Sequence, residues 1–307
     1  MSSAPESTRM PYELAAEEIR AHVSPLLGLG ERKPRIQKWI KRSVLVNEIL
    51  LRYDGHSPVL VTGRRGPVAV ISRLRRDLTP TVGGKMPELL GSFEIRDTVF
   101  TVTELPAGEP IEDSSKLPDI ALALAELDAA YRDGWGERPY PEGITETILD
   151  SSPLEKIGKR LGGDPGELAA ELADRLADFS RELFEDYPRG LIHGDPGVDN
   201  AFAGEDGVTF TGGPGELGPG IVDVAYLMQS AAACLEDFDP GPTISSLADY
   251  YGKSEEKFEE DLRIADIAAH INLAAWFDRC ATELMTEYDE LYDHLLEARI
   301  RALDSLV

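Results

Sequence analysis

The sequence has few of the residues that build metal clusters or disulfide frameworks. It contains two cysteines, Cys234 and Cys280, and five scattered histidines in 307 residues. The histidines do not have the spacing of a zinc motif, and two cysteines in apolar helical contexts do not make a disulfide scaffold. A reduced cytoplasmic compartment is the simplest interpretation of this composition.

Long apolar runs are absent as well. No stretch reaches the roughly 18 uncharged apolar residues that a membrane-spanning helix needs, so we expect no membrane partner. Residues 1–9 are polar and lack the apolar core of a secretory signal. Hydrophobic residues make up 42% of the chain and charged residues 28%, which is typical of a globular protein. The length accommodates one large domain or two lobes that share a cleft.

Basic residues are scarce relative to acidic ones. The chain has 31 Lys and Arg against 56 Asp and Glu, and its net charge is −25. Such an excess repels itself in dilute buffer, and concentrated salt screens the repulsion. We interpret this charge as halophilic adaptation to a salty cytoplasm; the alternative is an ordinary acidic cytosolic protein.

The basic residues that are present gather in one region. Residues 31–76 hold twelve Lys and Arg against three acidic residues, a local net charge of +9, so the rest of the chain carries −34. A basic region in an acidic chain suggests an anionic ligand. The alternative is a solvated face, or pairing with acidic residues elsewhere in the molecule.

Strand signals precede helix signals along the chain. Short β-branched runs separated by turn signals predict about five strands in one antiparallel sheet, at residues 43–53, 59–62, 68–72, 92–95 and 98–103. After the break at residues 105–108, apolar residues recur at helical spacing, in residues 117–131, 167–187, 222–235, 255–275 and 279–306. We therefore expect an α+β fold, with a helical extension over 1–42, a strand-rich lobe over 43–105 and a mainly helical lobe over 106–307.

The segment 191–200 carries the clearest chemistry. It reads Leu-Ile-His-Gly-Asp-Pro-Gly-Val-Asp-Asn and places Asn200 five residues after Asp195 in a loop rich in Gly and Pro. Kinase catalytic loops use this spacing, because the Asp orients the attacking hydroxyl and the Asn binds Mg²⁺. A predicted hairpin follows the loop, and Gly218 and Asp223 lie just beyond it.

This pattern resembles the aminoglycoside phosphotransferase and choline kinase family. The family has a loop H-G-D-x-x-x-x-N, a hairpin that carries a metal-binding Asp, and a later Gly followed by an Asp that begins a helix. The resemblance implies a bilobal protein kinase-like fold, with a small antiparallel-sheet N-lobe and a larger helical C-lobe. It implies that Asp195 is the catalytic base, Asn200 a metal ligand, Asp223 a support for the loop, and His193 a structural residue of that loop.

The chain departs from the family at the metal position. Thr211 stands seven residues before Gly218, where the family carries its metal-binding Asp. A neutral hydroxyl is a weaker Mg²⁺ ligand than a carboxylate, so Mg²⁺ binding is in doubt. Three other acidic residues are available as substitutes if the loop folds differently: Glu216, Asp206 and Asp199.

The front of the chain departs as well. Residues 68–73 resemble the kinase strand that carries a Lys, but they contain no Lys; Arg73 is the candidate phosphate contact there. After residue 76 the sequence leaves little room for the helix that supplies the partner Glu. Glu104 and Leu105 begin a segment that resembles the family's hinge, whose backbone binds adenine; the alternative is a plain linker.

These observations favour an ATP-dependent phosphotransferase that acts on a hydroxyl of an unidentified small molecule, with ATP and Mg²⁺ as the implied cofactors. The alternative is a degenerate kinase-like protein that binds a nucleotide or a partner without turnover. A third reading is a polyanion binder that uses residues 31–76. Nucleic acid is not an expected partner, because binding through exposed charge would be weak at high salt.

Overall fold

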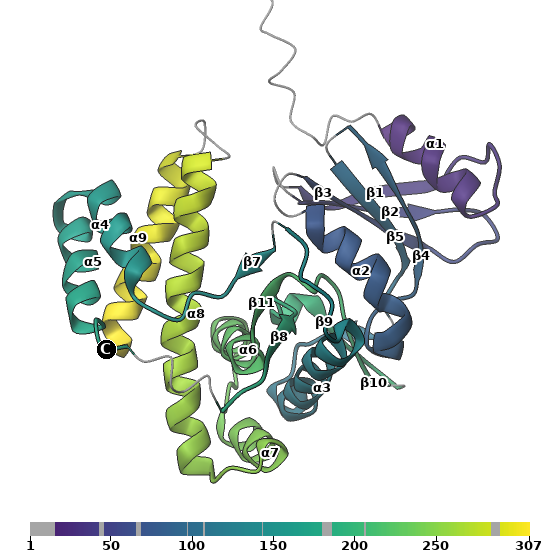
Figure 1. Cartoon of the computed structure of the whole chain (residues 1–307). Coiled ribbons are helices and arrows are strands. Elements are labelled where there is room, and N and C mark those ends of the chain that lie inside the picture. The colour runs from purple at the N-terminus through teal and green to yellow at the C-terminus, as the bar shows by residue number, and fades with distance from the viewer. Residues whose placement is uncertain are drawn as a thin grey trace, which may run out of the picture.

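Figure 1 shows the computed structural model of the chain, which has two lobes. It describes residues 16–42, 46–65, 69–96, 98–106, 108–142, 144–179, 186–205, 207–283 and 289–307. The smaller lobe is a sheet with one helix on each side, and the larger lobe is mainly helical, so the expected α+β bilobal fold is confirmed. No helix in these ranges has both the length and the apolar composition needed to cross a membrane.

The N-lobe is built on a five-stranded antiparallel sheet. Its strands are β1 (Ile36–Arg42), β2 (Val46–Arg52), β3 (Val59–Arg65), β4 (Leu89–Ile95) and β5 (Thr98–Glu104), in the order β1-β2-β3-β5-β4. β1 lies before the expected boundary at residue 42, so the sheet begins inside the segment that we expected to be a helical extension. The strand was missed because four of its seven residues are polar or basic and do not alternate with apolar ones.

The two faces of this sheet have different partners. Helix α1 (Ala16–Leu26) covers one face, where Ile19 and Val23 pack against alternate strand residues such as Val61. Side chains alternate along a strand, so Thr62 and Arg64 lie on the opposite face. Helix α2 (Ala69–Val82) lies on that face, between the sheet and the C-lobe (Figure 1).

Helix α2 corrects two expectations. We predicted a strand over 68–72 and too little room for a helix after residue 76, but the helix occupies residues 69–72 and continues past residue 76 to Val82; residue 68 lies outside the described residues. Its buried residues Val70, Leu74, Leu78 and Val82 are four apart, which places them on one face against the core of the C-lobe. The first apolar turn of this helix is indistinguishable from a short strand when it is read alone.

The C-lobe begins after the hinge. Its helices are α3 (Leu117–Trp135), α4 (Ser152–Leu161), α5 (Gly163–Arg175), α6 (Gly220–Cys234), α7 (Gly241–Tyr251), α8 (Glu255–Glu283) and α9 (Asp289–Leu306). The helix expected over 167–187 is α5, which begins and ends earlier. The helix expected over 279–306 is the end of α8 followed by α9, and these two pack against each other (Figure 1).

Two small sheets position the loops between the lobes. One contains β6 (Glu109–Pro110), β9 (Ala201–Gly204) and β10 (Gly207–Phe210); the other contains β7 (Thr145–Glu146), β8 (Arg189–Ile192) and β11 (Glu216–Pro219). β8 and β11 are antiparallel, so the chain leaves β8 and enters β11 at the same end of the sheet. The loop after β8 and the loop before β11 therefore lie side by side.

Candidate active site

The two adjacent loops, 193–200 and 211–215, are joined by backbone hydrogen bonds. Gly215 N donates to Ile192 O at 3.1 Å, and Thr211 N donates to Asn200 O at 2.8 Å. The β9–β10 hairpin connects the loops, and its antiparallel register brings Phe210 opposite Ala201. The residues that the sequence singled out on both sides of this hairpin thus meet at one place.

The side chain of His193 is hydrogen-bonded to both loops. Its side chain is buried, its Nδ1 accepts a hydrogen bond from Asp195 N at 3.2 Å, and its Nε2 lies 2.8 Å from Thr211 O. Since Nδ1 is an acceptor, the proton is on Nε2, which donates to the carbonyl. Burial lowers the pKa of His193 to about 4, so the ring is neutral at pH 7. These contacts leave no free ring nitrogen for a proton transfer.

Asp195 lies at the surface of these two loops. Its side chain is exposed, while its backbone is held by the His193 contact and by Asn200 Nδ2, which donates to Asp195 O at 2.8 Å. Gly194 precedes it with φ +82, and a Cβ at this position would collide with the side chain of Glu216. Glycine is therefore required there, and the carboxylate of Asp195 is presented on a fixed backbone.

A buried acidic pair supports the loop from below. Asp223, in the first turn of α6, accepts from Gly194 N at 2.9 Å, and Asp128 of α3 accepts from His193 N at 3.1 Å. Burial raises the pKa of both carboxyl groups, and the charge of Asp223 raises that of Asp128 further, so Asp128 is the one that stays protonated. The sequence pointed to Asp223 but missed Asp128, whose signal is an acid on the apolar face of α3 between Leu124 and Tyr131.

The two predicted metal positions, Asn200 and Thr211, lie together, but neither side chain is charged. Thr211 Oγ1 lies 3.2 Å from Asn200 Oδ1, so the side chains of the two predicted positions do meet. Both oxygens are neutral, and the hydroxyl donates to the amide oxygen that would bind a cation. Among the described residues, no three His, Cys, Asp or Glu side chains form a group that could hold a metal ion. These residues do not fit the Mg²⁺ site that the family resemblance implies.

Glu216 is the substitute acid that lies nearest to the loop. Its side chain is half-buried, contacts Gly194 and accepts from Thr147 Oγ1 at 3.4 Å. Burial raises its pKa to about 8, helped by the charges of Asp223 and Asp195, so Glu216 is largely protonated at pH 7. A protonated carboxyl group does not replace the missing carboxylate. Asp199 is exposed, and Asp206 lies outside the described residues.

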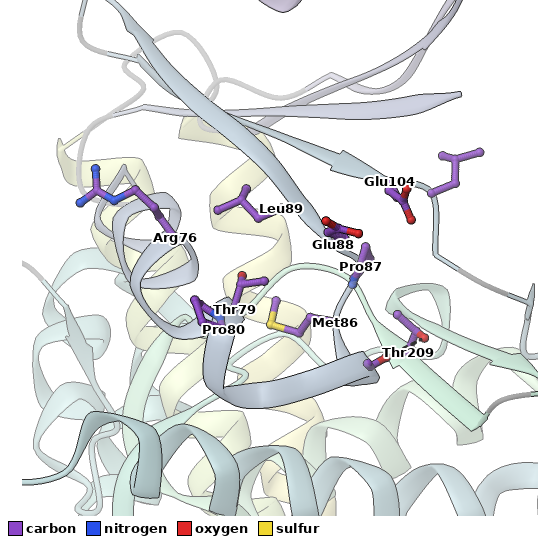
Figure 2. A pocket seen from close by; sticks show the side chains of 11 residues that line it. Arg76, Thr79, Pro80, Met86, Pro87, Glu88, Leu89, Glu104 and Thr209 are labelled. Carbon is purple, nitrogen blue, oxygen red and sulfur yellow. Dashed lines mark hydrogen bonds between the residues drawn. The ribbon is translucent and has the colours of Figure 1, made fainter. Parts of the chain in front are cut away.

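The hinge residues border a cavity of about 630 Å³. Glu104 ends β5, and Leu105 follows it with an exposed side chain. Figure 2 shows Glu104 close to Glu88 on one side of the cavity and Thr79 of α2 opposite them. Thr209 of β10 closes the cavity from the C-lobe side, so the predicted hinge lies between the lobes.

Three exposed arginines of the basic region 31–76 form ion pairs with nearby acidic residues. Arg73 lies on α2 rather than on a strand, is exposed and pairs with Glu94 at 3.7 Å. Arg35 pairs with Asp54, and Arg76 with Asp77. Exposed pairs of this kind contribute little to stability, and they reduce the free positive charge that a polyanion would need.

Two arginines of this region differ from these, and neither was predicted as a site residue. Arg64 of β3 is 4% exposed and Arg75 of α2 is 1% exposed. Arg64 Nη2 donates to Gly212 O at 3.5 Å, which places β3 against the loop 211–215. The burial of Arg64 could have been inferred from the alternation of side chains along β3. The burial of Arg75 could have been suspected because it directly follows Leu74, a residue of the buried helix face.

Solved structures of small-molecule kinases share this fold. A choline/ethanolamine kinase family protein from Mesorhizobium loti aligns over 94% of both chains with a TM-score of 0.63 and 12% identity. A GDP and kanamycin complex of an APH(2″) aminoglycoside phosphotransferase covers 93% of this chain and 98% of its own, with a TM-score of 0.61 and 14% identity.

The amicoumacin kinase hAmiN, solved with AMP-PNP, Ca²⁺ and Ami, covers 94% of this chain and 96% of its own, with a TM-score of 0.61 and 12% identity. No family model and no curated protein sequence matches the chain. At these identities the comparisons show the fold, which is the one that the motif in residues 191–223 implied.

Proposed function

We propose that the protein is a nucleotide-dependent phosphotransferase that acts on a hydroxyl group of a small molecule. The observation that carries this proposal is the exposed carboxylate of Asp195 on a backbone held by His193 and Asn200. A general base needs such fixed placement at an open site. The shared fold with kinases that bind GDP or AMP-PNP supports a nucleotide between the lobes.

The proposed reaction requires one proton transfer by the chain. The acceptor hydroxyl oxygen forms a bond to the γ-phosphorus, the bond from that phosphorus to the bridging oxygen breaks, and a nucleoside diphosphate leaves. Asp195 orients the hydroxyl and accepts its proton. His193 and Glu216 are not bases in this scheme, because the first is buried and hydrogen-bonded and the second is largely protonated.

A second candidate function is nucleotide binding without transfer. It is favoured by Thr211, because phosphoryl transfer normally uses metal-bound carboxylates to neutralise charge. The same fold and the same interlobe cavity would serve a binding protein, so only turnover separates the two candidates.

The test is calorimetric titration of ATP and GTP in concentrated KCl, with and without Mg²⁺, followed by a γ-phosphate transfer assay against a panel of hydroxyl compounds. Replacing Asp195 with Ala is expected to lower transfer by about 10²–10⁴-fold and to leave nucleotide binding largely intact. The matched control is Glu205→Ala, an exposed acid in the following hairpin. Binding without transfer to any acceptor would favour the second candidate, and no binding of either nucleotide would overturn both.

A further inference from the structure

The arginine pair, Arg64 and Arg75, is buried between the sheet, α2 and the loop 211–215. Ser72 Oγ donates to Val99 O at 3.4 Å, and Val99 is the β5 residue directly opposite Arg64. Arg75 follows Ser72 by three residues and therefore lies on the same side of the helix. Ile71 of α2 also lies against Gly215. The two guanidinium groups thus lie behind the loop that carries Thr211.

These guanidinium groups have unused donors. Arg64 Nη1, Arg75 Nε and Arg75 Nη2 are buried and have no hydrogen-bond partner among the described residues. Neither side chain forms an ion pair with a described carboxylate; Glu48, the acid with the greatest influence on Arg64, accepts from Thr62. Burial, and then the charge of Arg64, lower the pKa of Arg75 to about 10. The charges of Glu48 and Asp195 act on Arg64, but they leave these donors without a hydrogen-bond partner. Buried cations with unpartnered donors are costly, which indicates that an anion belongs there.

The site beside this pair has lost negative charge relative to the family pattern. A neutral Thr stands at the metal position, and a cation, Arg75, comes from the helix that follows β3, where kinases supply a Glu. Two arginines carry the same formal charge as one divalent cation. Their planar donors match the oxygens of a phosphate group.

We propose that the arginine pair binds the phosphate groups of the nucleotide directly and supplies the charge that Thr211 no longer recruits through a metal ion. Nucleotide binding is then independent of divalent cations. This inference rests on the proposed function for the identity of the ligand, since the site itself recognises any small polyphosphate. Arg64 and Arg75 bind the oxyanion through the donors that have no partner among the described residues.

The test measures binding in EDTA and in Mg²⁺, with ATP, inorganic tripolyphosphate and inorganic phosphate as separate ligands. The wild-type protein is expected to bind ATP and tripolyphosphate in EDTA, with affinities within about threefold of those in Mg²⁺ and with a raised melting temperature. Arg75→Met is expected to weaken both by about tenfold or more, and Arg64→Met likewise. Arg75→Glu, which gives Arg64 an internal partner, is expected to abolish them.

The matched control is Arg52→Met, an exposed basic residue of the same sheet, which is expected to leave both affinities unchanged. ATP binding that needs Mg²⁺ and ignores Arg75 would overturn the inference while the phosphotransferase proposal stands. If tripolyphosphate binding needs Arg75, ATP binds no more tightly than tripolyphosphate and no phosphate is transferred, the oxyanion site is supported and the nucleotide function is overturned. No binding in EDTA, with Arg75→Met only raising the melting temperature, would assign the pair to internal structure alone.

Discussion

Glu216 is a carboxyl group whose ionisation opposes folding. In the folded chain its pKa is raised to about 8 by burial and by Asp223 and Asp195, whereas its ordinary value is 4.5. Between these two values the unfolded chain loses the proton and the folded chain keeps it. The free energy of unfolding therefore falls as the pH rises through this window and levels off above it.

Replacing Glu216 with Gln removes this titration, because the amide is neutral at every pH. The free energy of unfolding of the variant, relative to wild type, is expected to rise by about 1–2 kcal/mol between pH 5 and pH 8.5. Urea denaturation of both proteins between pH 5 and pH 8.5, in the same salt, measures this difference in the free energy of unfolding. Asp128 and Asp223 titrate in both proteins, so their contribution largely cancels in the difference, apart from the coupling between Asp223 and Glu216. Parallel curves would show that Glu216 is ionised in the fold.

Thr211 is the residue at which one substitution is expected to restore a metal site. In Thr211→Asp a carboxylate would replace the hydroxyl that lies 3.2 Å from Asn200 Oδ1. Mg²⁺ prefers charged oxygen donors, so nucleotide affinity is expected to become about tenfold or more stronger in Mg²⁺ than in EDTA. Titration of ATP under both conditions, and Mn²⁺ binding followed by electron paramagnetic resonance, provide the measurement.

The control for this substitution is Thr211→Asn, which has a similar shape and no charge. Since the position is 6% exposed, the new carboxylate is expected to lower the metal-free stability by about 1–3 kcal/mol, unless the arginine pair neutralises it. Equal Mg²⁺ dependence in the two variants would mean that the Asn200 amide is not placed to bind a cation.

At the scale of elements, the sequence predicted those features that depend on a short stretch of chain. The spacing of Asp195 and Asn200 reflects a loop whose hydrogen bonds join near neighbours, so the motif by itself predicts where the candidate site lies. The strands β2, β3, β4 and β5 were recognised because their β-branched runs end at clear turns. Such features need no knowledge of which segment packs against which.

Helix α2 shows what local pattern does not decide. Its first turn reads as a strand, and only the four-residue spacing continued through Val82 reveals the helical face. Arg75 and Arg64 are eleven residues apart in sequence and lie on different elements. They form a pair only because α2 packs on the sheet. Asp128 likewise acquires its role from Asp223 on another helix. Pairs formed by tertiary packing leave no fixed spacing in the sequence, so the arginine pair could not be predicted from it.

At the scale of the whole molecule, the net charge of −25 predicts that salt stabilises the fold and that folding and ligand binding respond to salt differently. Screening relieves repulsion between exposed carboxylates, so the melting temperature is expected to rise by several degrees, roughly 5 °C or more, between 0.1 M and 2 M KCl. The melting temperature of an ordinary acidic protein would stop rising within the first few tenths molar of KCl, whereas that of a halophilic protein would continue to rise.

Tripolyphosphate binding at the arginine pair is expected to weaken by less than about tenfold over the same range, because buried charges are screened less than exposed ones. Binding through exposed basic residues would instead fall steeply with each contact. Thermal melting and EDTA titrations in one KCl series separate these cases. A steep loss of affinity with salt that persists in Arg75→Met would assign the ligand to the exposed basic residues of 31–76. A shallow loss in the wild type, with binding weakened in Arg75→Met, would assign it to the arginine pair.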